Sequence, residues 1–296
     1  PRFGPDRIRR FAAAHDDYDH HTETHFSALG VHDAGDVAPW DDVSEYLDHL
    51  AAELRSVRLA GAVPLVLGGE HTVTYAGVEA VDPDVLVVVD AHLDLREAYD
   101  DNRWSHACVT RRALGVVDRV VVVGARTGSA AEWDRAADAD VDVIAPEDAR
   151  TWVDGVDADT FADETAYLSV DIDGVDPGFA PGTGTMEPFG LHPREVRDLV
   201  RAVAPHAAGF DVVEVNDRDD GQAAALAGRL LRAFVFANAA AARECPAAIV
   251  LVGVSPESAA DPIRLRRRGG YWRPIPPPSS RSTRGDSYTR CGRPRR

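Results

Sequence analysis

The stretch VLVVVDAHLDLR, residues 85–96, decides the fold that this sequence predicts. Its first five residues are apolar at every position, which is typical of a strand covered on both faces by other elements. Three ionisable residues follow at every second position: Asp90, His92 and Asp94. Because side chains alternate between the two faces of an extended chain, these three project from one side, with about 7 Å between neighbours. The stretch therefore predicts a buried strand whose carboxyl end carries a polar site.

Similar apolar runs recur along the chain, separated by segments with helical periodicity. The further strand candidates are VPLVLGG (63–69), RVVVVG (119–124), VDVIAP (141–146), AYLSVD (166–171) and FDVVEVN (210–216). Residues 41–60 and 193–204 carry apolar side chains at spacings of three and four, as in amphipathic helices. This alternation predicts an α/β domain with a mainly parallel central sheet between helices.

Polar residues follow several of these strands, and ligands of such sheets bind beyond the carboxyl ends of the strands. Four carboxylates in one dry cleft would repel one another unless cations neutralised them. Two His and four Asp suit manganese or another first-row ion better than calcium or structural zinc. The candidate metal ligands are His71, Asp90, His92, Asp94, Asp171 and Asp173.

Three motifs carry a family resemblance. GGEHT (68–72), DAHLD (90–94) and SVDIDGVDPGFAPGTGT (169–185), in this order, resemble the ureohydrolases, the family of arginase and agmatinase. The resemblance extends from about residue 2 to about residue 242. It implies a three-layer α/β/α arginase-like fold, two Mn²⁺ per subunit and a homo-oligomer, either a trimer or a hexamer.

The resemblance also implies a role for each ligand. His71 and His92 would be the terminal ligands of the two ions, Asp90 and Asp171 would bridge them, and Asp94 and Asp173 would complete one shell each. Asp94 would in addition hold the hydroxide that bridges the two manganese ions.

Two further residues match catalytic positions of the family. His106, in NRWSHACVTRR, corresponds to the proton-shuttling His, although a His that caps a local helix is the structural alternative. Glu214, in DVVEVND, corresponds to the Glu that binds the guanidinium group. Two cations lower the pKa of the shared water, and the resulting hydroxide would attack the guanidinium carbon.

The loop LREAYDDNRWSHA (95–107) is similar to that of agmatinases. Its acidic residues Glu97, Asp100 and Asp101 would attract the distal ammonium of agmatine and repel a carboxylate, which predicts hydrolysis of agmatine to urea and putrescine. Arginase, guanidinobutyrase and formiminoglutamase activities stay open, because Met186 and Glu187 depart from the family's pattern near the pocket mouth. A deacetylase of related fold and a non-catalytic, metal-stabilised assembly subunit are the alternatives from other classes.

The composition restricts the partners. The formal charge is −17, and eleven Arg against one acid after residue 261 leave about −27 on residues 1–261. We therefore expect neither a nucleic-acid nor a membrane partner, and the resemblance implies a small guanidine substrate. The acidic, Lys-free chain suits a halophilic source, with codon bias in a GC-rich genome as the alternative. Three scattered Cys and the lack of a signal-peptide pattern predict a cytoplasmic protein.

The two ends of the chain differ from its middle. PRFGPDRIRRFA (1–12) begins like a loop entering a helix, which leaves open an opening strand upstream of residue 1. We expect the ureohydrolase domain to span residues 1–242. Residues 243–296 are expected to be an atypical, basic, Pro/Gly/Arg-rich tail without a core of its own, and therefore disordered. Its origin as a genuine tail or an out-of-frame translation stays open.

Overall fold

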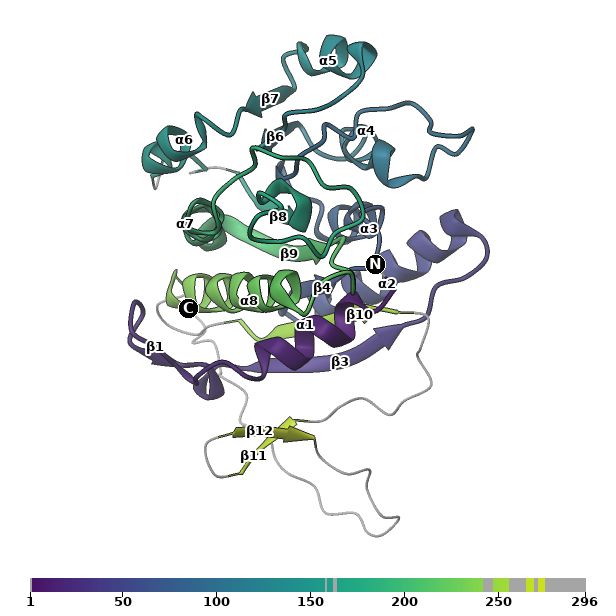
Figure 1. Cartoon of the computed structure of the whole chain (residues 1–296). Coiled ribbons are helices and arrows are strands. Elements are labelled where there is room, and N and C mark those ends of the chain that lie inside the picture. Colours follow the sequence, from purple (N-terminus) through teal and green to yellow (C-terminus); the bar gives the residue numbers. More distant parts are fainter. Residues whose placement is uncertain are drawn as a thin grey trace, which may run out of the picture.

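The central feature of the computed structural model is one parallel sheet of eight strands (Figure 1). The structure describes residues 2–157, 159–161, 164–241 and 247–255, and the backbone of 265–268 and 271–274. Across the sheet the order is β3 (Val31–Val37), β10 (Ile249–Val254), β4 (Val63–Leu67), β9 (Ala207–Val213), β8 (Ala166–Asp171), β5 (Val85–Val89), β6 (Arg119–Val123) and β7 (Val141–Ile144). Every neighbouring pair is parallel.

Helices cover both faces of this sheet, so the predicted three-layer α/β/α fold is confirmed. One layer contains α1 (Gly4–Ala12), α6 (Ala149–Gly155), α7 (Pro193–Val203) and α8 (Gln222–Ala241). The other contains α2 (Val43–Leu59), α3 (Val73–Val81), α4 (Val109–Ala113) and α5 (Ala130–Ala136). In Figure 1 the purple α1 lies beside the green α8, although the two are far apart in the sequence.

Short elements complete the fold. The 3₁₀ turns are η1 (Phe26–Ala28), η2 (His106–Cys108), η3 (Ile172–Gly174) and η4 (Ala204–His206). The strands β1 (Tyr18–Asp19) and β2 (Thr24–His25) pair antiparallel, as do β11 (Leu265–Arg268) and β12 (Tyr271–Pro274). Of these, η2 and η3 follow β5 and β8 and lie at the carboxyl edge of the sheet.

Strand β5 shows why its sequence is apolar at every position. Val85, Val87 and Val89 pack into the cluster beneath α7 and α8, whereas Leu86 and Val88 pack into the cluster on the opposite face. All five side chains are at most 1% exposed. A polar residue at any of these positions would be buried on one face or the other, so the sequence shows no alternation.

Helix α8 is a core helix. Among the described helices it alone has the length and mean hydropathy of a membrane span, and 61% of that window is buried. The ring of Phe234 on α8 stacks on that of Phe210 on β9, with centroids 4.6 Å apart. The apolar character of α8 is thus accounted for by its packing on the sheet.

The sheet includes a strand beyond the expected domain boundary at residue 242. Strand β10, IVLVGV, lies beyond that residue and pairs on both sides, with β3 and with β4. Its apolar run is of the same kind as those of the other central strands, whereas the edge strand β3, VHDAGDV, contains no buried residue. Apart from residues 247–255 and the backbones of β11 and β12, the expected disordered tail lies outside the described residues.

Candidate functional site

The candidate site lies where four strands of the sheet end together. Strands β4, β9, β8 and β5 are adjacent in that order, and each is followed by residues singled out in the sequence. His71 follows β4, Glu214 follows β9, and Asp171 ends β8. Asp90 directly follows β5. Because the strands are parallel, their carboxyl ends meet at one edge and bring these side chains together.

The first group of side chains surrounds His71. Its Nδ1 lies 3.1 Å from Asp94 Oδ2, 3.3 Å from Asp90 Oδ2 and 3.4 Å from Asp171 Oδ2. All four residues are buried, with exposed fractions of 5% or less. Three carboxylate oxygens and one imidazole nitrogen thus face one small volume.

The second group surrounds His92 and shares Asp90 with the first. The Nδ1 atom of His92 lies 3.3 Å from Asp90 Oδ1 and 3.2 Å from Asp173 Oδ2. The donor atoms of His71, Asp90 and Asp171, and likewise those of Asp90, His92 and Asp173, lie within 4.8 Å of one another. The structure therefore brings all six sequence-predicted ligands into two adjoining groups, with one oxygen of Asp90 toward each.

Backbone hydrogen bonds orient the carboxylates. Asp171 Oδ1 accepts from the Asp173 amide at 2.9 Å, and Asp173 Oδ1 accepts from the Ala91 amide at 3.2 Å. Each of these two residues thereby keeps its Oδ2 directed at an imidazole. Asp94 has a left-handed φ of 52°, a conformation that non-glycine residues rarely adopt and that is common at functional sites.

The charges of this cluster fit cations. Burial and neighbouring carboxylates raise the pKa of Asp171 well above its usual range and that of Asp94 to about 7. Although burial opposes it, contacts with Asp173 and Asp90 raise the pKa of His92 to about 11. Asp90 Oδ2 is buried without a hydrogen-bond donor among the described residues. Divalent ions would replace the protons that these raised pKa values imply on the Asp and His side chains, and would provide a partner for Asp90 Oδ2. The donor set therefore fits two metal ions.

A hydrogen-bonded chain behind His71 fixes its ring. Ser169 Oγ donates to Asp211 Oδ1 at 2.6 Å and lies 3.4 Å from His71 Nε2. Since the hydroxyl proton is engaged by Asp211, the oxygen is free to accept from Nε2–H, and in the neutral imidazole, the form that binds a metal ion, Nδ1 then carries a lone pair toward the carboxylate group. Sequence reasoning missed Ser169 and Asp211. The available signal was a polar residue at a fully buried position of each strand.

His106 and Glu214 lie at the same edge. His106 Nδ1 is 3.5 Å from Glu70 Oε1, and this carboxylate raises the pKa of the half-exposed imidazole. Glu214 Oε1 accepts from the His71 amide at 2.9 Å, and burial together with Glu70 raises the pKa of Glu214 to about 7. A Cβ built on Gly184 would lie 3.7 Å from Glu214 Oε2, so residues 181–190, which we name the rim loop, border this carboxylate.

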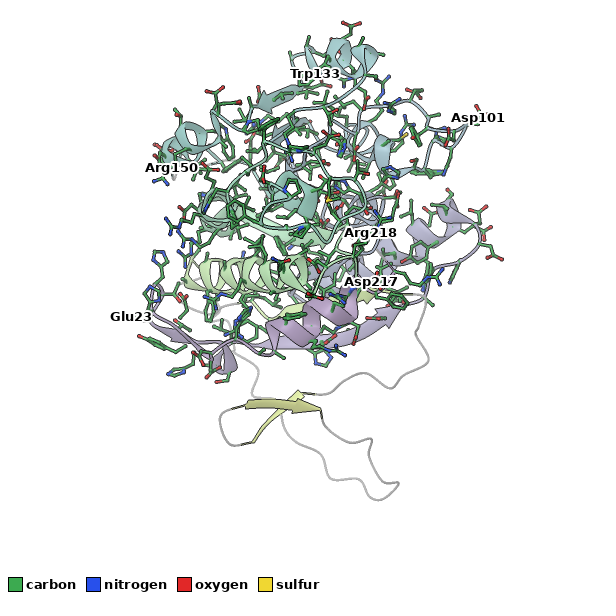
Figure 2. The ribbon with its side chains drawn as sticks, viewed as in Figure 1. Glu23, Asp101, Trp133, Arg150, Asp217 and Arg218 are labelled. Atoms are coloured by element: carbon green, nitrogen blue, oxygen red, sulfur yellow. The ribbon has the colours of Figure 1, made fainter. Side chains whose placement is uncertain are left out.

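Two acidic residues of the 95–107 loop, Glu97 and Asp101, are less favourably placed for substrate binding than His106 and Glu214. Glu97 forms ion pairs with Arg111 at 3.0 Å and Arg112 at 3.2 Å, which neutralise its charge. Figure 2 shows Asp101 at the outer tip of its loop, pointing away from the sheet. Asp217 and Arg218, also labelled there, follow β9, and Arg218 Nη1 donates to the Gly184 carbonyl at 3.0 Å. Glu97 therefore no longer supports the prediction that acidic residues of this loop attract the distal ammonium of agmatine.

Comparisons with known proteins agree with this geometry. The family model described as "Arginase family" matches residues 1–237. The chain is 37% identical to the N(1)-aminopropylagmatine ureohydrolase of Thermococcus kodakarensis, over 78% of this chain and 82% of that protein. It is 34% identical to the agmatinase of Pyrococcus horikoshii, over 78% and 83%. The crystal structure of the agmatine ureohydrolase of Thermoplasma volcanium superposes with a TM-score of 0.74, at 34% identity, over 82% and 85% of the two chains.

Proposed function

The chain belongs to the arginase family and is a ureohydrolase, and from this premise we propose that it hydrolyses the guanidinium group of agmatine to urea and putrescine with two Mn²⁺ bound. The observation that carries the proposal is the pair of ligand groups that share Asp90. Two ions a few ångströms apart with a carboxylate between them are a recurring arrangement in metal-dependent hydrolases.

The proposed ligands are His71, Asp90, His92, Asp94, Asp171 and Asp173. Six nitrogen and oxygen donors without a thiolate favour manganese or a similar first-row ion over structural zinc. When bound, the ions would supply Lewis acidity that lowers the pKa of a shared water toward neutrality.

The side chains of the chain would bind and orient the substrate. Glu214 offers Oε2 on the side of the rim loop, where a carboxylate can pair with the planar guanidinium group in bidentate fashion. Its Oε1 is held by the His71 amide, so the substrate-binding carboxylate and the first ligand group are connected by one hydrogen bond. This contact would place the guanidinium carbon next to the ligand groups.

Proton transfer would involve Asp94 and His106. Asp94 is buried beside His71 and would hold a proton of the attacking water at its carboxylate. Collapse of the tetrahedral adduct requires a proton on the departing amine nitrogen, and His106, half exposed and raised in pKa by Glu70, would donate it. The products are then urea and the protonated amine.

The identity of the amine is supported by the relatives rather than by the 95–107 loop. Several similar proteins are named agmatinases, and one at 37% identity is named N(1)-aminopropylagmatine ureohydrolase. N(1)-aminopropylagmatine is therefore the second candidate substrate, since it carries the same guanidinium group on a longer polyamine. Arginine and 4-guanidinobutyrate differ by carrying a carboxylate.

The test is urea release from these four guanidines, measured side by side with manganese-loaded protein at low and high salt. We expect agmatine to have the highest kcat/KM. Preference for N(1)-aminopropylagmatine would replace the substrate and keep the site, whereas preference for a carboxylate-bearing guanidine would refute the polyamine assignment. No urea from any of them, with two ions bound, would refute the proposed reaction.

A further inference from the structure

Arg126 uses its whole guanidinium group to bind backbone carbonyls around the candidate site. It lies three residues after the end of β6 and is partly buried. Its Nε donates to Pro188 at 3.1 Å, its Nη1 to Gly124 at 2.9 Å and Gly174 at 3.2 Å, and its Nη2 to Asp173 at 2.8 Å and Glu187 at 2.6 Å. Five carbonyls match the five N–H donors of a guanidinium group. Among the described residues Arg126 forms no ion pair with a carboxylate.

The backbone of Arg126 adds a further connection. Its amide donates to the Ala91 carbonyl at 2.9 Å, and the Ala91 amide in turn donates to Asp173 Oδ1 at 3.2 Å. Ala91 lies between Asp90 and His92. Arg126 therefore connects the two chain segments that carry the second ligand group, one through its main chain and the other through its side chain.

The same side chain holds the rim loop. Its bonds to the carbonyls of Glu187 and Pro188 fix the C-terminal end of that loop. The N-terminal end is fixed separately, because the Asn216 amide donates to the Gly182 carbonyl at 2.9 Å. The fit around Arg126 is tight. A Cβ built on Gly190 would lie 2.6 Å from Arg126 Nη2 and 2.6 Å from the Asp176 amide nitrogen, so a larger residue there would displace the guanidinium group and the Asp176 backbone.

We propose that Arg126 is a positioning residue that sets the geometry of the Asp90–His92–Asp173 group and joins it to the rim loop beside Glu214. This inference rests on the two-ion site of the proposed function. It predicts a selective effect, because Arg126 contacts Asp173 and Gly174 but none of the atoms that hold His71. Loss of these bonds should weaken the binding of the ion held by Asp90, His92 and Asp173 and make the rim loop less rigid, while the ion beside His71 stays bound.

The discriminating variant is Arg126→Lys, which keeps the charge but has three donors on one atom and cannot reach five separated carbonyls. The matched control is Arg119→Lys, at the opposite end of the same strand, where the guanidinium group binds Glu164 at 3.1 and 2.6 Å. Manganese binding to the metal-free full-length protein is measured by calorimetry and by the electron paramagnetic resonance signal of coupled ions, with KM for agmatine as a separate readout.

We expect two ions in the parent protein and in Arg119→Lys. In Arg126→Lys one of the two ions should bind tenfold to hundredfold more weakly, with loss of the coupled signal and a raised KM. Gly190→Ala, which keeps the Arg126 side chain but crowds both it and the Asp176 backbone, should show the same selective loss to a smaller degree. Equal affinities for both ions and an unchanged KM in both variants would overturn the inference and leave the proposed function intact.

An equal weakening of both ions would also overturn the inference, since that is the result of a general loss of structure. Fewer than two ions in the parent protein would instead refute the proposed two-ion function, and this inference with it. The Gly190→Ala variant keeps the test valid if Arg126→Lys does not fold.

Discussion

Removal of β10 should unfold the domain, although this strand lies beyond the boundary that the sequence suggests. A chain that ends at residue 241 keeps every candidate site residue and seven strands of the sheet. It loses the strand between β3 and β4, so that both of these would face a gap with unpaired N–H and C=O groups.

The magnitude follows from the burial of β10. Ile249, Leu251, Val252 and Val254 are between 2% and 8% exposed. Burial of one such side chain contributes about 1.5–3 kcal/mol, so the four together contribute roughly 6–12 kcal/mol. That range is comparable with the entire free energy of unfolding of a typical domain, about 5–15 kcal/mol.

The assay is guanidinium-induced unfolding, followed by circular dichroism, of chains that end at residues 241, 255 and 296. The chain ending at 255 contains all eight strands and, like the full chain, should unfold cooperatively, whereas the chain ending at 241 should show no cooperative transition. A cooperative transition of the 241 chain at the midpoint of the full chain would refute the assignment of β10 to the core. Val252→Asp in the full chain offers a second test, because it would place a charge in the dry cluster beneath α2.

Further predictions concern the site. His71→Ala should remove one ion and nearly all urea release; two bound ions with normal turnover would contradict its role. Ser169→Ala should weaken manganese binding about tenfold to hundredfold in calorimetry, because the ring of His71 loses its orienting acceptor. Glu70 raises the pKa of His106, so Glu70→Gln should lower that pKa and shift the alkaline limb of kcat/KM to lower pH; an unshifted limb would argue against His106 as the proton donor. Glu97→Gln should change kcat/KM for agmatine less than about threefold, since Arg111 and Arg112 already neutralise this carboxylate; a larger loss would restore the acidic-loop argument.

The sheet was predictable wherever a strand is buried on both faces. All six strand candidates form strands, and the helix candidates 41–60 and 193–204 correspond to α2 and α7. The pattern of β5 makes this possible, because each of its residues lies in one of two apolar clusters. The edge strand β3 has no such pattern, since one of its sides faces no other strand and none of its residues is fully buried. Strand β10 does have the pattern, but it is a short apolar segment immediately before a basic one, and the average composition of residues 243–296 hides it.

At the site, the metal-ligand candidates could be predicted from the sequence, but the residues that orient them could not. The ligand candidates are recognisable because their spacing is local: Asp90 and His92, or Asp171 and Asp173, are two positions apart at the end of one strand. Their supporting contacts are not local. Ser169 is 98 residues from His71 and 42 from Asp211 in the sequence.

Strand order explains why these distant residues meet. Strands β4, β5, β8 and β9 follow that order along the chain but lie as β4, β9, β8 and β5 across the sheet, which places Ser169 of β8 beside Asp211 of β9 and within reach of His71 after β4. The partners of a residue such as Asp211 or Arg126 are set by strand order, so the segment that contains the residue does not show which residues it will contact. The sequence shows that Asp211, in FDVVEV, is an acidic residue within a buried strand. Its role in orienting the ring of His71 becomes clear only when the strand order is known.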